Sequence, residues 1–174
     1  MADRTILLDG FSKTFAMTGW RMGYGIFPGE WIPHISRLII NSVSCTSTFS
    51  QRAAVEALTG PRNEINAMLK AFASRRDLVY KGINEIPGLR CNKPEGAFYA
   101  FPNVTDTGLT SREYADYLLR EADVAVLPGT AFGEYGEGYV RISFANSEAN
   151  LTEALNRIRK ANQKLPAIVA ESRA

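Results

Sequence analysis

One short segment holds a lysine and an arginine eight residues apart, and it constrains the fold more than any other feature. Lys13 and Arg21 lie within residues 10–24, which read GFSKTFAMTGWRMGY. Apolar runs flank them: residues 5–8 have the pattern of a buried strand, and residues 21–27 that of a second strand stopped by a Pro-Gly pair. We therefore expect two strands joined by a loop that carries the lysine.

The two cations suit the two ends of a phosphorylated aldehyde. An amine held among apolar neighbours loses part of the hydration of its ammonium form and can attack a carbonyl to make a Schiff base. A guanidinium offers a planar fork of donors to a phosphate. A single lysine near a strand end is usually a solvated surface charge. Here Lys13 occurs with TGWR at residues 18–21 and with Gly23 and Tyr24, and the combination favours a cofactor site.

Residues 10–24 closely resemble the cofactor-lysine motif of the class I and II aminotransferases, fold-type-I pyridoxal-phosphate enzymes that include aspartate aminotransferase. The resemblance implies that Lys13 carries the aldehyde of pyridoxal 5'-phosphate and that Arg21 binds its phosphate. Gly10 departs from relatives that have a phosphate-binding serine there, which removes one hydroxyl from the site.

Arg141 is the third candidate. It lies in the apolar run at residues 139–144, where a cation is costly unless an anion meets it. Its anion could be an acidic neighbour such as Glu137, in a structural ion pair. The family resemblance implies instead that Arg141 holds the substrate α-carboxylate in a bidentate pair. Residues 94–99 and 128–133 also resemble segments that border the substrate pocket, where Phe98 and Phe132 could form apolar walls or ordinary core.

Composition excludes several other functions. Twenty Lys plus Arg against eighteen Asp plus Glu leave a net charge of +2, too small and scattered to indicate nucleic acid or an acidic membrane as partner. Cys45, Cys91 and the single His34 are not spaced like metal ligands, so no metal site is indicated. We find no signal peptide and no apolar stretch long enough to span a bilayer, and therefore expect a cytoplasmic protein.

Apolar spacing predicts the order of elements after the first two strands. A capping box formed by Thr110 and Glu113 should begin one of the helices. Helices are expected at residues 31–41, 49–58, from about 65 to 86, from 110 and at 148–164, and strands at 97–101, 124–127 and 139–144.

This order indicates an α/β fold in two parts. Residues 1–60 have the pattern of a C-terminal remnant of a large cofactor-binding domain, residues 61–165 that of a smaller α+β domain, and residues 166–174 that of a frayed tail. The resemblance covers nearly the whole chain and implies the C-terminal portion of an aminotransferase. The family's other cofactor ligands precede its lysine, whereas twelve residues precede Lys13. We therefore expect the chain alone to be incomplete and inactive.

The resemblance implies amino transfer between an amino acid and a 2-oxo acid by a homo-oligomer. Three alternatives stay open. The same residues would serve a carbon-sulfur lyase, a decarboxylase or a relative of aminocyclopropane-carboxylate synthase. The chain could be a non-catalytic fragment that only folds and self-associates. It could also be the aminotransferase-like domain of a transcription regulator.

Overall fold

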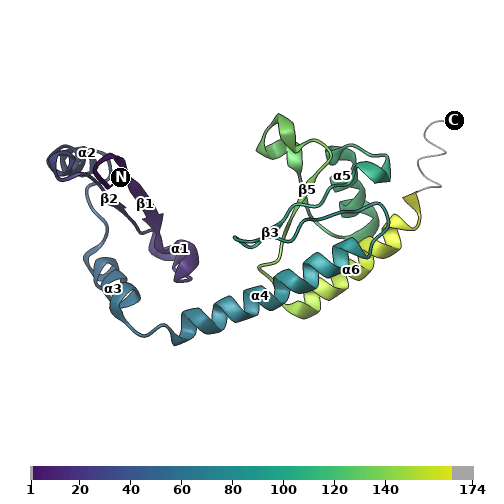
Figure 1. Cartoon of the computed structure of the whole chain (residues 1–174), viewed down its shortest axis with the longest axis horizontal. Helices are drawn as coiled ribbons and strands as arrows, with labels where there is room; N and C mark the ends of the chain where they lie inside the picture. The colour runs from purple at the N-terminus through teal and green to yellow at the C-terminus, as the bar shows by residue number, and fades with distance from the viewer. Residues whose placement is uncertain (1, 166–174) are drawn as a thin grey trace. The chain divides into compact units, whose positions relative to one another are not determined.

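The computed structural model describes residues 2–165, and the expected tail at residues 166–174 lies outside them. The chain divides into two compact units between Ala67 and Met68 (Figure 1). This division falls inside helix α4 (Asn63–Asn84), a few residues beyond the boundary expected at residue 60. Each unit is described by itself below.

The first unit begins with an antiparallel pair of strands. In β1 (Leu7–Gly10) and β2 (Gly23–Ile26), Leu7 lies opposite Ile26 and Gly10 lies opposite Gly23. The first strand therefore starts two residues later than expected. Its expected burial is wrong, because Leu8 is 73% exposed and no third strand pairs with either of the two within the described residues.

Two helices follow this hairpin, α2 (Ile32–Val43) and α3 (Thr48–Thr59), close to the ranges that apolar spacing predicts. The unit has a small core made of Phe11, Met17 and Met22. The alanines of α3 pack against it (Ala53, Ala54 and Ala57). Through this core, the connection between β1 and β2 packs against α3.

The first unit leaves much apolar surface in water. Leu8 of β1, Leu38 and Val43 of α2 and Phe49 of α3 are each between 66% and 73% exposed. Exposed apolar area of this kind marks an association surface or an aggregation liability.

We expect the isolated chain to self-associate through the first unit, or to leave residues 1–60 poorly ordered. Self-association should give a light-scattering mass at least twice that of one chain. Leu38→Lys should shift the population towards monomer, because a buried ammonium is costly. The control Leu119→Lys, at a 55% exposed leucine of the second unit, should not. A well-ordered monomer would contradict the expectation.

The second unit contains a three-stranded antiparallel sheet. Its central strand is β5 (Val140–Ser143), which pairs with β3 (Tyr99–Ala100) on one side and β4 (Leu127–Pro128) on the other. The strands expected at residues 97–101 and 124–127 are therefore shorter. Ala97 has a left-handed backbone with φ of 58°, which keeps it out of β3. In the other strand only Leu127 and Pro128 find partners on β5.

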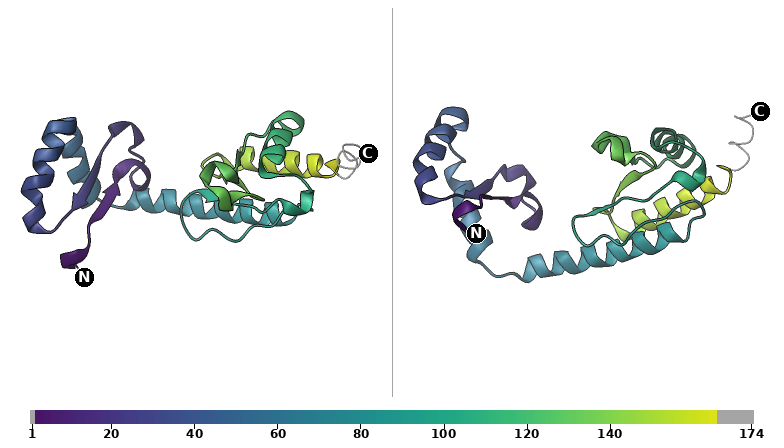
Figure 2. Two further views of the ribbon diagram at one scale, coloured as in Figure 1. Left: turned by 90° about the horizontal axis from the view of Figure 1, so that it is seen from above. Right: turned by 45° about the horizontal axis from the view of Figure 1, so that its top comes forward.

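Three helices cover this sheet: α4, α5 (Ser111–Ala122) and α6 (Glu148–Asn162). The expected capping box at the start of α5 is confirmed, because Thr110 and Glu113 each bond the other's backbone N–H. Helices α4 and α6 run side by side (Figure 2), and a Cβ on Gly82 would lie 2.6 Å from Leu155 Cδ1. The short 3-10 turns described besides those of the site are η1 (Ala2–Arg4), η3 (Gly29–Trp31), η4 (Thr105–Thr107) and η6 (Glu134–Gly136).

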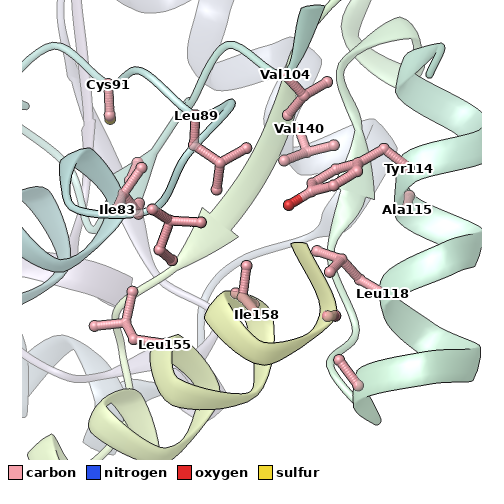
Figure 3. Close-up of a cluster of buried hydrophobic side chains, with 14 of the residues drawn as sticks. Ile83, Leu89, Cys91, Val104, Tyr114, Ala115, Leu118, Val140, Leu155 and Ile158 are labelled. Atoms are coloured by element: carbon pink, nitrogen blue, oxygen red, sulfur yellow. The ribbon is translucent and has the colours of Figure 1, made fainter. Parts of the chain in front are cut away.

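The core of the second unit lies between these helices and the sheet (Figure 3). Ile83, Leu155 and Ile158 reach it from α4 and α6, and Val140 reaches it from β5. Tyr114 of α5 is fully buried, and its hydroxyl donates to Asn162 Oδ1 at 2.8 Å. Burial raises the pKa of Tyr114, so the hydroxyl remains a neutral donor.

Two glycines close the segment that leads from β4 to β5. A Cβ on Gly136 would overlap the backbone carbonyl of Gly129, which cannot move without breaking the turn. Gly136→Ala should therefore lower the free energy of unfolding by about 2 kcal/mol or more, measured by thermal unfolding. The matched control is Gly96→Ala, since a Cβ there meets no atom within 4 Å. Equal melting temperatures for the two variants would contradict this account of the turn.

Candidate functional site

Lys13 lies in the connection between β1 and β2. The expected loop is wrong in detail, because Lys13 belongs to a short helical turn, α1 (Phe11–Thr14). Gly10 is extended before this turn, and afterwards the N–H of Phe15 donates to Phe11 O at 3.3 Å and that of Ala16 to Lys13 O at 3.2 Å. The side chain of Lys13 is exposed. The turn therefore presents the amine at the surface of the first unit.

Arg21 follows a second turn in the same connection, η2 (Thr18–Trp20). Its backbone is left-handed, with φ 52° and ψ 55°. For a residue other than glycine this conformation costs about 1–3 kcal/mol, and such residues concentrate at ligand-binding sites. The guanidinium is exposed, and its Nη1 donates to Thr18 O at 3.2 Å.

The small core of the first unit holds both turns in place. Phe11 precedes Lys13 and donates its N–H to Met22 O at 3.2 Å, while the N–H of Met17 reaches Phe11 O at 3.4 Å. Phe11, Met17 and Met22 are at most 9% exposed. Lys13 and Arg21 therefore lie on one closed connection, with buried residues before, between and after them.

A tyrosine and an aspartate lie at the base of this connection. Asp9 of β1 and Tyr24 of β2 face each other in the strand register, and the Tyr24 hydroxyl donates to Asp9 Oδ2 at 3.2 Å. Desolvation raises the pKa of Tyr24, and the hydrogen bond and negative charge of Asp9 raise it further. The pair links the two strands next to α1, and the sequence reasoning missed it because cross-strand register depends on the length of the connection.

A shallow hollow of about 430 Å³ opens beside η2. Gly19 and Trp20 line one part of it, and Ser47, Phe49 and Ser50 at the start of α3 line another. The rings of Trp20 and Phe49 meet edge to face, with centroids 6.2 Å apart. The hollow gives the first unit a concave surface at the turn that precedes Arg21 in sequence.

The groups of this connection fit a phosphorylated aldehyde. A primary amine and a guanidinium are both exposed on one backbone segment. Arg21 adopts a left-handed backbone although it is not a glycine, and such residues are typical of ligand-binding positions. Lys13 would take the aldehyde and Arg21 the phosphate, as the chemistry of amines and guanidinium groups predicts.

Arg141 belongs to the second unit, where it occupies the centre of the sheet on β5. The alternative of an ion pair with Glu137 is wrong, because the Glu137 carboxylate accepts the N–H of Ser111 at 2.9 Å instead. Within residues 2–165 no carboxylate forms a salt bridge with Arg141. Its guanidinium instead lies over the rings of Tyr99 and Phe132, at 4.2 and 4.1 Å from their centroids.

The two phenylalanines considered as pocket walls have different surroundings. Phe98 packs against the core of the second unit, with its ring centroid 6.1 Å from that of Phe72. Phe132, at the end of η5 (Gly129–Phe132), is 49% exposed and contacts Arg141. Sequence reasoning did not single out Tyr99, although alternation along the strand expected at residues 97–101 puts its side chain on the face opposite to that of Phe98.

Three further observations concern possible metal ligands, the cysteines and membrane-spanning helices. In the described part of the chain, His, Cys, Asp and Glu side chains form no group of three or more that could hold a metal ion. Cys45 and Cys91 are free thiols. Among residues 2–165, no helix is both long enough and apolar enough to cross a membrane.

Comparison with known proteins gives the family. The model of aminotransferase class I and II matches residues 1–158. An aspartate aminotransferase of Pyrococcus horikoshii is 45% identical over 161 residues, which cover 91% of this chain and 41% of the relative. An aromatic-amino-acid aminotransferase of Thermococcus litoralis is 47% identical over 163 residues, which cover 92% of this chain and 41% of that relative.

Solved structures of aminotransferases are also similar to this chain. A crystal structure of an aromatic aminotransferase from Pyrococcus horikoshii has a TM-score of 0.89 at 47% identity, covering 95% of this chain and 45% of that one. The crystal structure of the aspartate aminotransferase from Rhizobium meliloti has a TM-score of 0.88 at 42% identity, and the match covers 93% of this chain and 42% of that one.

The chain belongs to the class I and II aminotransferases. The expected α/β fold of a fold-type-I aminotransferase is confirmed. Enzymes of this family depend on pyridoxal 5'-phosphate. The chain spans about two fifths of the length of the curated relatives it matches.

Proposed function

We propose that this chain contributes the cofactor lysine, the phosphate-binding arginine and the substrate-binding arginine of an enzyme that transfers an amino group from an amino acid to a 2-oxo acid. The observation that carries the proposal is the presence of Lys13 and Arg21 on one connection closed by Phe11, Met17 and Met22. Membership of the aminotransferase family supports the same assignment.

Each residue has one task in this proposal. Pyridoxal phosphate, when bound, supplies an aldehyde for the substrate amine and a ring that withdraws electrons from the substrate. Lys13 would hold that aldehyde through Nζ, and its amine, when free, would take the proton from the substrate Cα. Arg21 holds the phosphate by hydrogen bonds from its guanidinium, and Arg141 orients the substrate by its α-carboxylate.

The proposal extends to the organisation of the protein. Residues 1–60 belong to a large cofactor-binding domain and residues 61–165 to a small domain, and the protein works in the cytoplasm as a homo-oligomer. The exposed apolar residues of β1, α2 and α3 support association. The apolar surface that they leave uncovered also supports the assignment of residues 1–60 to a larger sheet domain.

An isotope experiment tests the reaction. The polypeptide that carries this sequence in the cell is incubated with pyridoxal phosphate, a 15N-labelled amino acid and a 2-oxo acid. We expect 15N in the amino acid formed from the 2-oxo acid, and no transfer when the 2-oxo acid is omitted. Release of carbon dioxide or of a thiol in place of transfer would contradict the proposed reaction and favour a decarboxylase or a lyase.

A further inference from the structure

Two aromatic side chains hold the guanidinium of Arg141. Its Cζ lies 4.2 Å from the ring centroid of Tyr99 and 4.1 Å from that of Phe132, well inside the distance at which a cation is attracted to a ring face. The two rings come from different elements, β3 and η5. Arg141 is only partly buried, so the contacts do not follow from core packing alone.

The fold fixes both rings independently of any ligand. Tyr99 is paired with Ser143 of β5, two residues beyond Arg141 on the same strand. Phe132 ends a turn that begins at Gly129, and the Gly129 N–H donates to Tyr139 O at 2.7 Å, which attaches the turn to the start of β5. The Phe132 ring also meets the ring of Phe101 edge to face, with centroids 6.4 Å apart.

These contacts leave the hydrogen-bonding capacity of Arg141 unused. A ring engages the face of the guanidinium plane, whereas the five N–H donors radiate within that plane. The acidic neighbour Glu137 is engaged with Ser111, and no salt bridge to Arg141 occurs among residues 2–165. A planar anion could therefore bind at the edge of the Arg141 guanidinium, whose plane the two rings already hold in one orientation.

We propose that Tyr99 and Phe132 are positioning residues, which hold the guanidinium of Arg141 by its faces so that its edge binds a carboxylate. This inference rests on the proposed role of Arg141 as the carboxylate-binding residue. Pre-organisation lowers the conformational entropy that the long arginine side chain loses on binding. The rings also attract the cation without neutralising its charge, as an acidic partner would.

The test uses the full 174-residue chain and pyruvate, the simplest 2-oxo acid, with binding followed through the NMR signal of the Arg141 Nε–Hε group. We expect Phe132→Leu and Tyr99→Leu each to raise the dissociation constant of pyruvate about threefold to tenfold. Tyr99→Phe keeps the ring and should rescue binding. The control Tyr135→Leu, at a tyrosine that is 92% exposed, should leave binding unchanged.

A double-mutant comparison separates positioning from direct contact. Binding is followed here through the line broadening of the pyruvate methyl signal, which needs no arginine at position 141. In an Arg141→Lys background, Phe132→Leu should cause little further weakening, because the plane that the ring holds is gone. Equal weakening in both backgrounds would overturn the proposal, since the ring would then contact the ligand itself. An unchanged dissociation constant in Phe132→Leu would overturn it too.

Failure of the proposed function gives a different result. If pyruvate does not perturb Arg141 any more than pyruvamide, its neutral amide, the carboxylate role of Arg141 is wrong and the inference falls with it. The contact itself is measured without ligand, from the ring-current shift of Arg141 Hε. This shift should decrease in Phe132→Leu and persist in Tyr135→Leu; an unchanged shift would overturn the inference alone.

Discussion

Replacement of Lys13 by alanine should abolish the change in visible absorbance that pyridoxal phosphate undergoes when it is added to the chain. Alanine has no amine, so the covalent bond to the aldehyde cannot form, whereas Arg21 can still bind the phosphate without changing the colour. The expected loss is complete, because no partial substitute for a primary amine exists at that position. The measurement is an absorbance titration of the wild-type and variant chains.

A second exposed lysine provides the matched control. Lys70 on α4 is also exposed, and Lys70→Ala should retain the wild-type absorbance. Equal absorbance in Lys13→Ala and wild type would show that another amine reacts and would remove Lys13 from the site. Weak cofactor binding is expected even for wild type, because Lys13 and Arg21 are the two cofactor-binding residues proposed for this chain.

Arg141→Lys should lower the catalytic efficiency of amino transfer about tenfold to a hundredfold, in the polypeptide that carries this sequence in the cell. Lysine keeps the positive charge but loses the bidentate fork and the ring contacts with Tyr99 and Phe132. A hydrogen bond to a charged group contributes about 1.5–3 kcal/mol, and one such loss sets the expected range.

The cofactor signal distinguishes this effect from misfolding. Arg141 and the connection that carries Lys13 belong to different compact units, so Arg141→Lys should leave the fold of that connection intact and retain the visible absorbance of bound cofactor. The kinetic assay would contradict the carboxylate role if catalytic efficiency were the same in wild type and variant.

Local sequence signals predicted the parts of the fold that depend on neighbouring residues. The capping box at Thr110 and Glu113 begins α5, since both hydrogen bonds form within one turn. The long apolar stripe that ends at Ile86 gives α4. The strands proved less predictable, because β3 and β4 are as long as their pairing with β5 and the left-handed Ala97 allow.

The candidate site was predictable to a similar extent. The motif around Lys13 supplied the residue types, but not the helical turn of α1, which depends on the packing of Phe11 against Met17 and Met22. The contacts of Arg141 could not be predicted from the sequence for another reason. Glu137 is close to it in sequence and bonds elsewhere, whereas Tyr99 is distant in sequence and contacts it through the sheet.

Borohydride reduction of the chain with pyridoxal phosphate tests the central assignment most directly. Reduction converts the carbon–nitrogen bond between amine and aldehyde into a stable secondary amine, so the cofactor stays on the lysine it has reached. After proteolysis, mass spectrometry should find the added mass on the peptide that contains Lys13. Label on a different lysine, with none on Lys13, would contradict the account.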